Sequence, residues 1–185
     1  MRLFVAIWPT DDVQRAIGAA AASVRRSGDG IAWVPNENLH VTVKFLGDVD
    51  ESRIPEIGIA LDEACRRVAT FDAATGQGGA FPDIGNPRVL FAAIERGGPE
   101  VALLAGKVET AMEAIGFKRE ERPFHGHVTV GRVRDSRRGV DAAARFLAAK
   151  LPEHSIPVSS LVLVRSTRTP EDLSYAPLTE HPFVD

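Results

Sequence analysis

Leu39-His40-Val41-Thr42-Val43-Lys44-Phe45-Leu46 is the stretch that decides the fold of this chain. Its residues alternate as those of a half-buried strand do, and a turn signal, Pro35-Asn36-Glu37-Asn38, stands just before it. Successive side chains of a strand point to opposite faces. His40 and Thr42 therefore share one face, while Val41 and Val43 anchor the other face in a core.

A second stretch repeats this pattern later in the chain: Phe124-His125-Gly126-His127-Val128-Thr129-Val130. By the same alternation, His127 and Thr129 share a polar face with valines behind it. A single His-x-Thr is most often only the polar face of a strand. Two copies in one chain favour a functional arrangement instead.

The surroundings of the two stretches also repeat, at a fixed offset of 87 residues. The aligned pairs are Leu3 with Leu90, Phe4 with Phe91, Ala6 with Ala93, Ile7 with Ile94, His40 with His127 and Thr42 with Thr129. Strand, helix and His-x-Thr strand thus occur twice in the same order, which indicates an internal duplication. We predict one domain over 1–185, made of two similar lobes at about 1–86 and 87–185. A pseudo-twofold relation between them would bring both polar faces together across a cleft.

The hydrophobic pattern predicts helices and strands along the whole chain. Strands are expected at 3–7, 31–34, 39–46, 88–94, 124–130, 156–165 and 175–183, with weaker signals near Phe71 and Phe81. Helices are expected at about 11–24, 53–68, 101–115 and 140–149. The first helix and its strand correspond to the third helix and its strand, in keeping with the duplication.

Composition and charge narrow the classes of protein that fit. A length of 185 residues with 44% apolar residues suits one compact domain. The chain has no apolar run of about 18 residues and no signal peptide, so we expect a cytoplasmic protein without membrane association. A net charge of -3 argues against a broad surface for long nucleic acid, so a nucleic-acid substrate would be held at an end. Cys65 is the single cysteine, which excludes an internal disulfide.

Two histidines and two hydroxyls around one small volume suit the in-line opening of a phosphodiester. One imidazole takes a proton from water and the other gives one to the leaving oxygen, because imidazole titrates near neutral pH. Threonine hydroxyls can donate to phosphate oxygens as charge develops there. Neither motif has a cluster of carboxylates beside it, so a two-metal mechanism lacks its usual ligands. We expect no metal and no other cofactor.

The two stretches with their flanks resemble the paired motifs of the 2H phosphoesterase superfamily, and specifically the RNA 2',3'-cyclic phosphodiesterases (LigT/ThpR). The resemblance lies in Asn38 to Gly47 and in Arg122 to Arg132, and extends to Arg2–Ile7, Pro87–Leu90 and Val164–Ser166. It implies a bilobal α+β fold with antiparallel sheets lining a central cleft and helices packed outside. It also implies hydrolysis of a terminal 2',3'-cyclic phosphate to a 2'-phosphate without metal.

The resemblance also implies roles for single residues. His40 and His127 are the expected catalytic histidines, His40 as general acid and His127 as general base, although the reverse order fits the sequence nearly as well. Thr42 and Thr129 complete the catalytic set. Arg132 matches an arginine that contacts the phosphate, and Phe45 lies where an aromatic ring can stack on a base. One departure is Gly126, where many relatives have proline.

Other functions remain open at this point. A 2'-5' RNA ligase or 2'-5' phosphodiesterase would keep the same residues, and a non-catalytic module for RNA ends would use the same cleft. The expected partner is RNA with a 2',3'-cyclic phosphate end, or a small cyclic nucleotide. We expect a monomer, because the sequence has no heptad pattern. His154 and His181 are expected at the surface, and Trp33 is expected to pack in the core.

Overall fold

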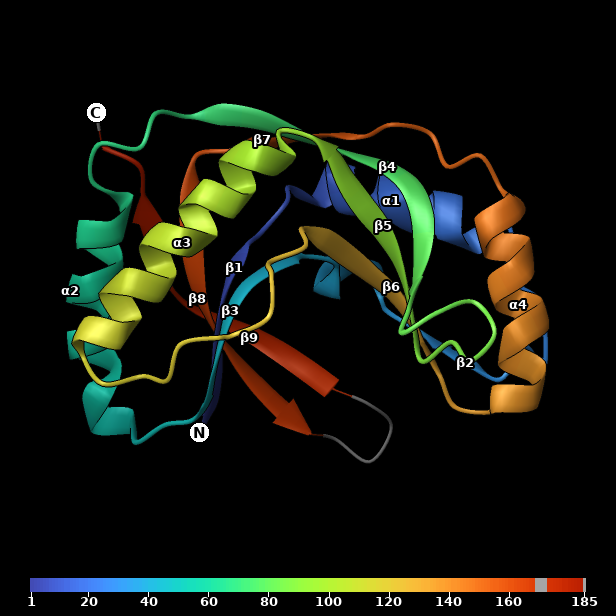
Figure 1. Ribbon diagram of the computed structural model, residues 1–185, viewed down its shortest axis with the longest axis horizontal. Helices are drawn as coiled ribbons and strands as arrows, with labels where there is room; N and C mark the ends of the chain where they lie inside the picture. Colours follow the sequence, from blue (N-terminus) through green and yellow to red (C-terminus); the bar gives the residue numbers. More distant parts are fainter. Residues whose placement is uncertain (169–172, 185) are drawn as a thin grey trace.

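The structure, a computed structural model, describes residues 1–168 and 173–184, and Ser136 only by its backbone. Within these residues, one curled sheet of nine strands carries four α-helices on its outer face (Figure 1). The helices are α1 (Asp11–Ala22), α2 (Ile54–Cys65), α3 (Gly98–Ala114) and α4 (Ser136–Ala148). The strands are β1 (Arg2–Ile7), β2 (Ile31–Trp33), β3 (Val41–Asp48), β4 (Phe71–Phe81), β5 (Val89–Arg96), β6 (His127–Val133), β7 (Ser155–Val158), β8 (Ser160–Arg168) and β9 (Leu173–Pro182).

The order of the strands is palindromic about the centre of the sheet. It runs β7-β4-β5-β6-β3-β1-β8-β9, with β2 also paired to β6, and every pairing between these strands is antiparallel. β6 and β3 meet at the centre, flanked by β5 and β1, and then by β4 and β8. β1, β3 and β4 of the first repeat thus have their counterparts β5, β6 and β8 at the mirrored places, as a duplication requires, whereas β2 has no counterpart among the described strands.

The two sides of the sheet do not follow the boundary near residue 86. β4 belongs to the first repeat but pairs with β5 of the second, and β8 belongs to the second but pairs with β1 of the first. Each side therefore combines strands from both repeats. The division at about 1–86 and 87–185 describes the sequence and not two separate bodies.

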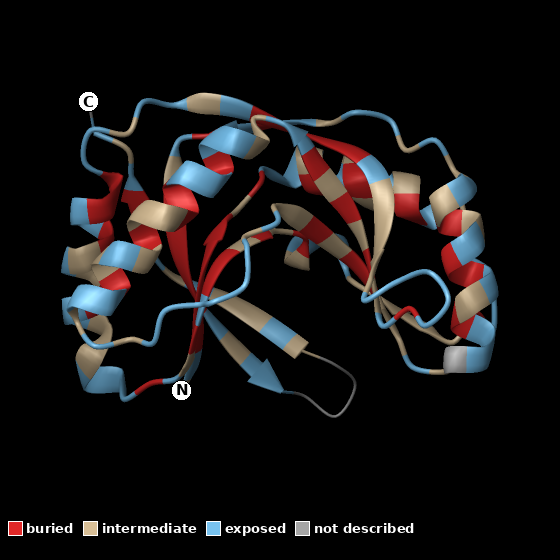
Figure 2. Cartoon of the chain, viewed as in Figure 1, coloured by how far each residue is buried: buried red, intermediate tan, exposed pale blue. Residues whose placement is uncertain are grey.

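Each side of the sheet is likewise covered by one helix from each repeat. α2 and α3 pack on the side of β3 and β8, and α4 packs on β4 together with α1, as Figure 1 shows. Apolar stripes of the helices bury against the sheet because residues three and four apart share a helix face. The resulting core includes Ile57 and Leu61 of α2, Leu104 and Val108 of α3, and Phe146 of α4. Figure 2 shows this buried layer between helices and strands.

The expected α+β class, with antiparallel strands and helices outside, is confirmed. Several details differ from the sequence-based expectation. The strand expected at 156–165 is two strands, β7 and β8, because Ser159 between them belongs to neither, and the helix expected at 140–149 begins at Ser136. The weak signals near Phe71 and Phe81 are the two ends of one strand, β4. The strand predictions at 39–46 and 124–130 began too early, because β3 starts at Val41 and β6 at His127. The antiparallel strands also form one continuous sheet instead of separate sheets.

Candidate active site

The two His-x-Thr motifs meet at the centre of the sheet. β3 and β6 pair there through Val41 and Val128. Among the described residues, this is the one pair that joins the two strands, and the residues on either side of it are His40 and Thr42 in the first motif and His127 and Thr129 in the second. Val41 and Val128 are buried on the helix side, so the four polar side chains lie on the other face, named here the site face. The electrostatic effect of His127 on His40 is consistent with two imidazoles that lie near each other.

A backbone carbonyl fixes the proton on His40. Nδ1 of His40 lies 2.7 Å from the carbonyl oxygen of Asn38, which can only accept a hydrogen bond. Nδ1 must therefore carry the hydrogen, and Nε2 is the bare nitrogen. Nε2 lies 3.0 Å from Oγ1 of Thr42, whose hydroxyl donates to it. The imidazole is thus held ready to accept a proton at Nε2.

His127 is held in the same way. Its Nδ1 lies 2.7 Å from the carbonyl oxygen of His125, again two residues earlier in the chain. Between them, the carbonyl of Gly126 accepts a hydrogen bond from the backbone N–H of Ile94 at 2.9 Å. The φ of Gly126 lies outside the left-handed region. Gly126, which stands where many relatives have proline, is therefore hydrogen-bonded to β5 and has an ordinary backbone conformation.

Aromatic rings enclose His40 and lower its pKa. The Trp8 indole stacks on the imidazole, with centroids 5.2 Å apart and planes at 5°. Phe4 and Tyr175 pack around it at 4.9 and 5.2 Å. Burial lowers the pKa of His40 from 6.5 to about 4, partly offset by its bond to the Asn38 carbonyl. The charges of Arg132 and His127 lower it further.

His127 lies in a second aromatic environment. Phe81 and Phe91 pack against its ring, each with centroids 5.2 Å apart. Burial lowers the pKa of His127, while the His125 carbonyl raises it in part. The charge of Arg132 lowers it as well, so this one guanidinium acts on both histidines. Near pH 7 both imidazoles are therefore neutral and able to accept a proton.

Two β-bulges determine which side chains reach the site face. Strict alternation from His127 would put Arg132 on the helix side with the buried valines. The pairing of Leu90 with Gly131 and of Phe91 with Thr129 leaves Val130 as an extra residue, and this shifts the alternation by one. Arg132 is thereby turned to the site face.

The same device acts on β3. Thr42 pairs with Ala6 but Lys44 pairs with Val5, which leaves Val43 as the extra residue. Phe45 therefore faces the same way as Thr42, opposite Phe4, with the two phenyl centroids 6.1 Å apart. Phe45 is 68% exposed, so it offers an open aromatic surface beside His40.

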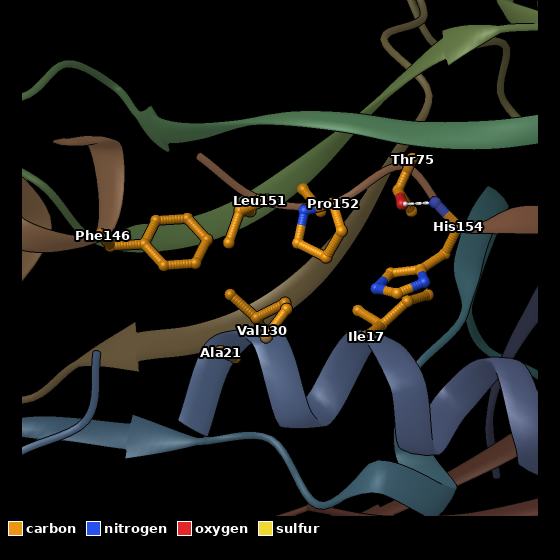
Figure 3. A pocket seen from close by; sticks show the side chains of 10 residues that line it. Ile17, Ala21, Thr75, Val130, Phe146, Leu151, Pro152 and His154 are labelled. Carbon is orange, nitrogen blue, oxygen red and sulfur yellow. Dashed lines mark hydrogen bonds between the residues drawn. The ribbon is translucent and has the colours of Figure 1, made fainter. Parts of the chain in front are cut away.

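The remaining histidines and Trp33 have other surroundings. His125 is exposed. His154 is only partly buried, on the helix side: its backbone N–H donates to Oγ1 of Thr75, beside a cavity of about 10 Å³ between α1 and the sheet (Figure 3). The surface prediction for His181 is wrong, because α2 covers β9 and its ring is bound to Asp62 and Thr179. Trp33 packs near Phe146, as expected.

Five aromatic residues around the histidines were not predicted. They are Phe4, Trp8, Phe81, Phe91 and Tyr175. A signal did exist for Phe4 and Phe91, since they align at the offset of 87. Tyr175 comes from β9 and Phe81 from β4, so only the tertiary fold brings them to the site.

Neither a metal-ligating cluster nor a membrane-spanning helix occurs in the described part of the chain. No group of three or more His, Cys, Asp or Glu side chains there could hold a metal ion. Among residues 1–168 and 173–184, no helix is both long enough and apolar enough to cross a membrane.

Comparison with known proteins finds relatives of nearly the whole chain. A protein from Aeropyrum pernix named RNA 2',3'-cyclic phosphodiesterase is 32% identical over 85% of this chain and 89% of its own. A protein of the same name from Thermus thermophilus is also 32% identical, over 96% of this chain and 88% of its own.

Solved structures share the fold. The crystal structure of TT0787 of Thermus thermophilus superposes with a TM-score of 0.80 at 28% identity, over 99% of this chain and 98% of the other. E. coli LigT complexed with 3'-AMP superposes with a TM-score of 0.79 at 21% identity, over 100% and 98%. The family described as LigT like phosphoesterase matches residues 7–91 and 94–174. The chain therefore belongs to the family of LigT-like phosphoesterases.

Proposed function

We propose that this phosphoesterase hydrolyses the 2',3'-cyclic phosphate at the end of an RNA to a 2'-phosphate, by acid/base catalysis that needs no metal. One observation carries the proposal: two imidazoles lie on one face, and each has its Nδ1 bound to a backbone carbonyl, so that Nε2 is the nitrogen that can exchange a proton with the substrate. The relatives named RNA 2',3'-cyclic phosphodiesterase support the choice of substrate.

The proposed reaction is one in-line displacement at phosphorus. His127 accepts a proton at Nε2 from the attacking water, and the new bond forms between that oxygen and phosphorus. The bond from phosphorus to the 3' oxygen breaks, and His40 gives the leaving oxygen its proton. Thr42 and Thr129 donate to non-bridging oxygens, and Arg132 offsets their charge. The product keeps its phosphate on the 2' oxygen.

The choice of which histidine is the acid and which is the base has a physical consequence. His40 is neutral in the free protein, because burial lowers its pKa to about 4. As general acid it must gain a proton when the substrate binds, and the anionic phosphate between the imidazoles favours that by raising its pKa. In the reverse order His40 would be the base. Its low pKa would suit that role, because it keeps the imidazole neutral and able to accept a proton. The pH profiles of the two single histidine variants separate these orders.

Phe45 is the proposed platform for the terminal base. Its open ring lies on the same face as His40 and Thr42. Stacking on one aromatic ring accepts any base, so we expect weak base preference. A single ring can stack on one base only, which fits an RNA substrate that is held at its end.

The first test is hydrolysis of an RNA oligonucleotide with a 2',3'-cyclic phosphate end, in EDTA, with identification of the product phosphate. We expect a 2'-phosphate from the wild type. We expect a loss of about 100- to 10,000-fold in kcat for His40→Ala and for His127→Ala, the usual cost of removing a general acid or base. His154→Ala is the matched control, because that ring lies on the helix side, and it should retain activity.

Three outcomes would contradict the proposal. Activity abolished by EDTA would mean a metal-dependent reaction. Cleavage or joining of 2'-5' dinucleotides with no action on the cyclic phosphate would favour the 2'-5' ligase or phosphodiesterase. Binding of the RNA end without turnover would mean a recognition module.

A further inference from the structure

Lys44 is a buried cation that the proposed reaction does not use. It is 4% exposed, although lysine is among the residues least often buried. The bulge at Val43 turns its side chain away from the site face and toward α3. There Nζ donates to Oε2 of Glu109 at 2.7 Å, and the Glu109 side chain is itself only 14% exposed.

The same ammonium group also binds the chain that leads into the second motif. Nζ of Lys44 donates to the carbonyl oxygen of Lys118 at 3.0 Å. Oε2 of Glu109 in turn accepts the backbone N–H of Glu120 at 3.3 Å. Both contacts lie on residues 115–126, the connection from α3 to β6, drawn in yellow in Figure 1. This connection includes His125, whose carbonyl orients His127.

One ion pair thus joins both motifs from behind the sheet. On one side it holds β3 two residues after Thr42, and on the other it holds the approach to His127. Burying a charged pair is costly unless its geometry and hydrogen bonds are good, so such a pair is weak evidence of a role in stability alone. The ion pair lies between the two motifs, so its role is better explained as holding one motif in place relative to the other.

We propose that Lys44 is a positioning residue, which sets the placement of His127 relative to His40 by tying β3 to the 115–126 connection through Glu109. The proposal rests on the acid/base function proposed above for the two histidines. Displacement of a reacting group by about 1 Å can cost on the order of 100-fold in rate. The buried pair would hold the two imidazoles within that tolerance.

The test compares Lys44→Met, the double variant Lys44→Met/Glu109→Met, and Lys118→Met. Lys44→Met removes the ammonium at similar length and should lower kcat for the cyclic phosphate roughly 10- to 100-fold. It should also lower Tm, because it leaves the Glu109 carboxylate largely buried and without its ammonium partner. The double variant removes that carboxylate, so Tm should recover while kcat stays low, since the tie is still absent. Lys118→Met is the matched control: its exposed side chain pairs with Glu121, and its carbonyl is retained.

A second readout is the NMR signal of each histidine ring, which is independent of the substrate. Lys44→Met should shift the His127 signal, and Lys118→Met should not. Recovery of kcat together with Tm in the double variant would overturn the proposal, as would an unshifted His127 signal in Lys44→Met. If the wild type fails to hydrolyse the cyclic phosphate, the proposed function fails, and the NMR comparison still decides whether Lys44 positions His127.

Discussion

At the scale of single residues, the site depends on how each imidazole is prepared. A carbonyl two residues before each histidine fixes the proton on Nδ1. Aromatic rings then exclude water and lower both pKa values. The two histidines differ in their surroundings: a stacked indole covers His40, whereas two phenyl rings border His127. Burial is thus the largest cause of the lowered pKa of each histidine, although different rings surround the two imidazoles.

Trp8→Ala tests the cause of the low pKa of His40. Burial is its largest cause, and the stacked indole of Trp8 is part of that burial. Water would reach the imidazole in the variant and stabilise its charged form, so the pKa should rise from about 4 toward 6.5. An NMR titration of the His40 ring measures it. Trp33→Ala is the control: it removes an indole that packs near Phe146, and it should leave the pKa of His40 unchanged. An unchanged pKa in Trp8→Ala would show that the indole does not control it.

At the scale of elements, β-bulges decide the content of the site. Without the extra residues Val43 and Val130, Phe45 and Arg132 would point into the core. Alternation alone predicts that wrong placement, because a bulge depends on pairing with β1 and β5 and leaves no clear mark in the sequence. The resemblance to known motifs indicated both residues for a different reason, namely their position after each His-x-Thr.

Gly79 of β4 makes room for the Phe91 ring beside His127. A Cβ on Gly79 would lie 2.2 Å from the Phe91 ring, which packs against both Phe81 and His127. Gly79→Ala should therefore displace Phe91, lower the stability by about 1–3 kcal/mol and reduce kcat. Thermal unfolding and the hydrolysis assay measure the two effects.

Gly106→Ala is the control for that substitution. A Cβ on Gly106 meets nothing within 4 Å, and the residue lies inside α3. Alanine there should stabilise the protein by about 0.5–1 kcal/mol and leave kcat unchanged. Equal effects of both alanines would contradict the packing role assigned to Gly79.

At the scale of the whole molecule, duplication explains the site. The palindromic strand order places β3 and β6 together, and their pairing at Val41 and Val128 brings His40 and His127 to one face. The repeat in the sequence predicts this meeting of the motifs. It does not predict the exchange of β4 and β8 between the two sides, because the offset of 87 relates sequences and is silent on which strands pair. Tyr175, from β9, reaches His40 only through that exchange.

The pH dependence of kcat/KM for a 2',3'-cyclic phosphate substrate tests the central claim most directly, in the wild type and in each histidine variant. We predict a bell for the wild type on the acidic side of pH 6.5, because burial lowers both pKa values in the free protein. His127→Ala should lose the low-pH limb, since a base must be deprotonated, and His40→Ala the high-pH limb, since an acid must be protonated. If His127→Ala instead lost the high-pH limb and His40→Ala the low-pH limb, His40 would be the base and His127 the acid. Both limbs persisting in both variants would contradict the claim that these histidines are the acid/base pair.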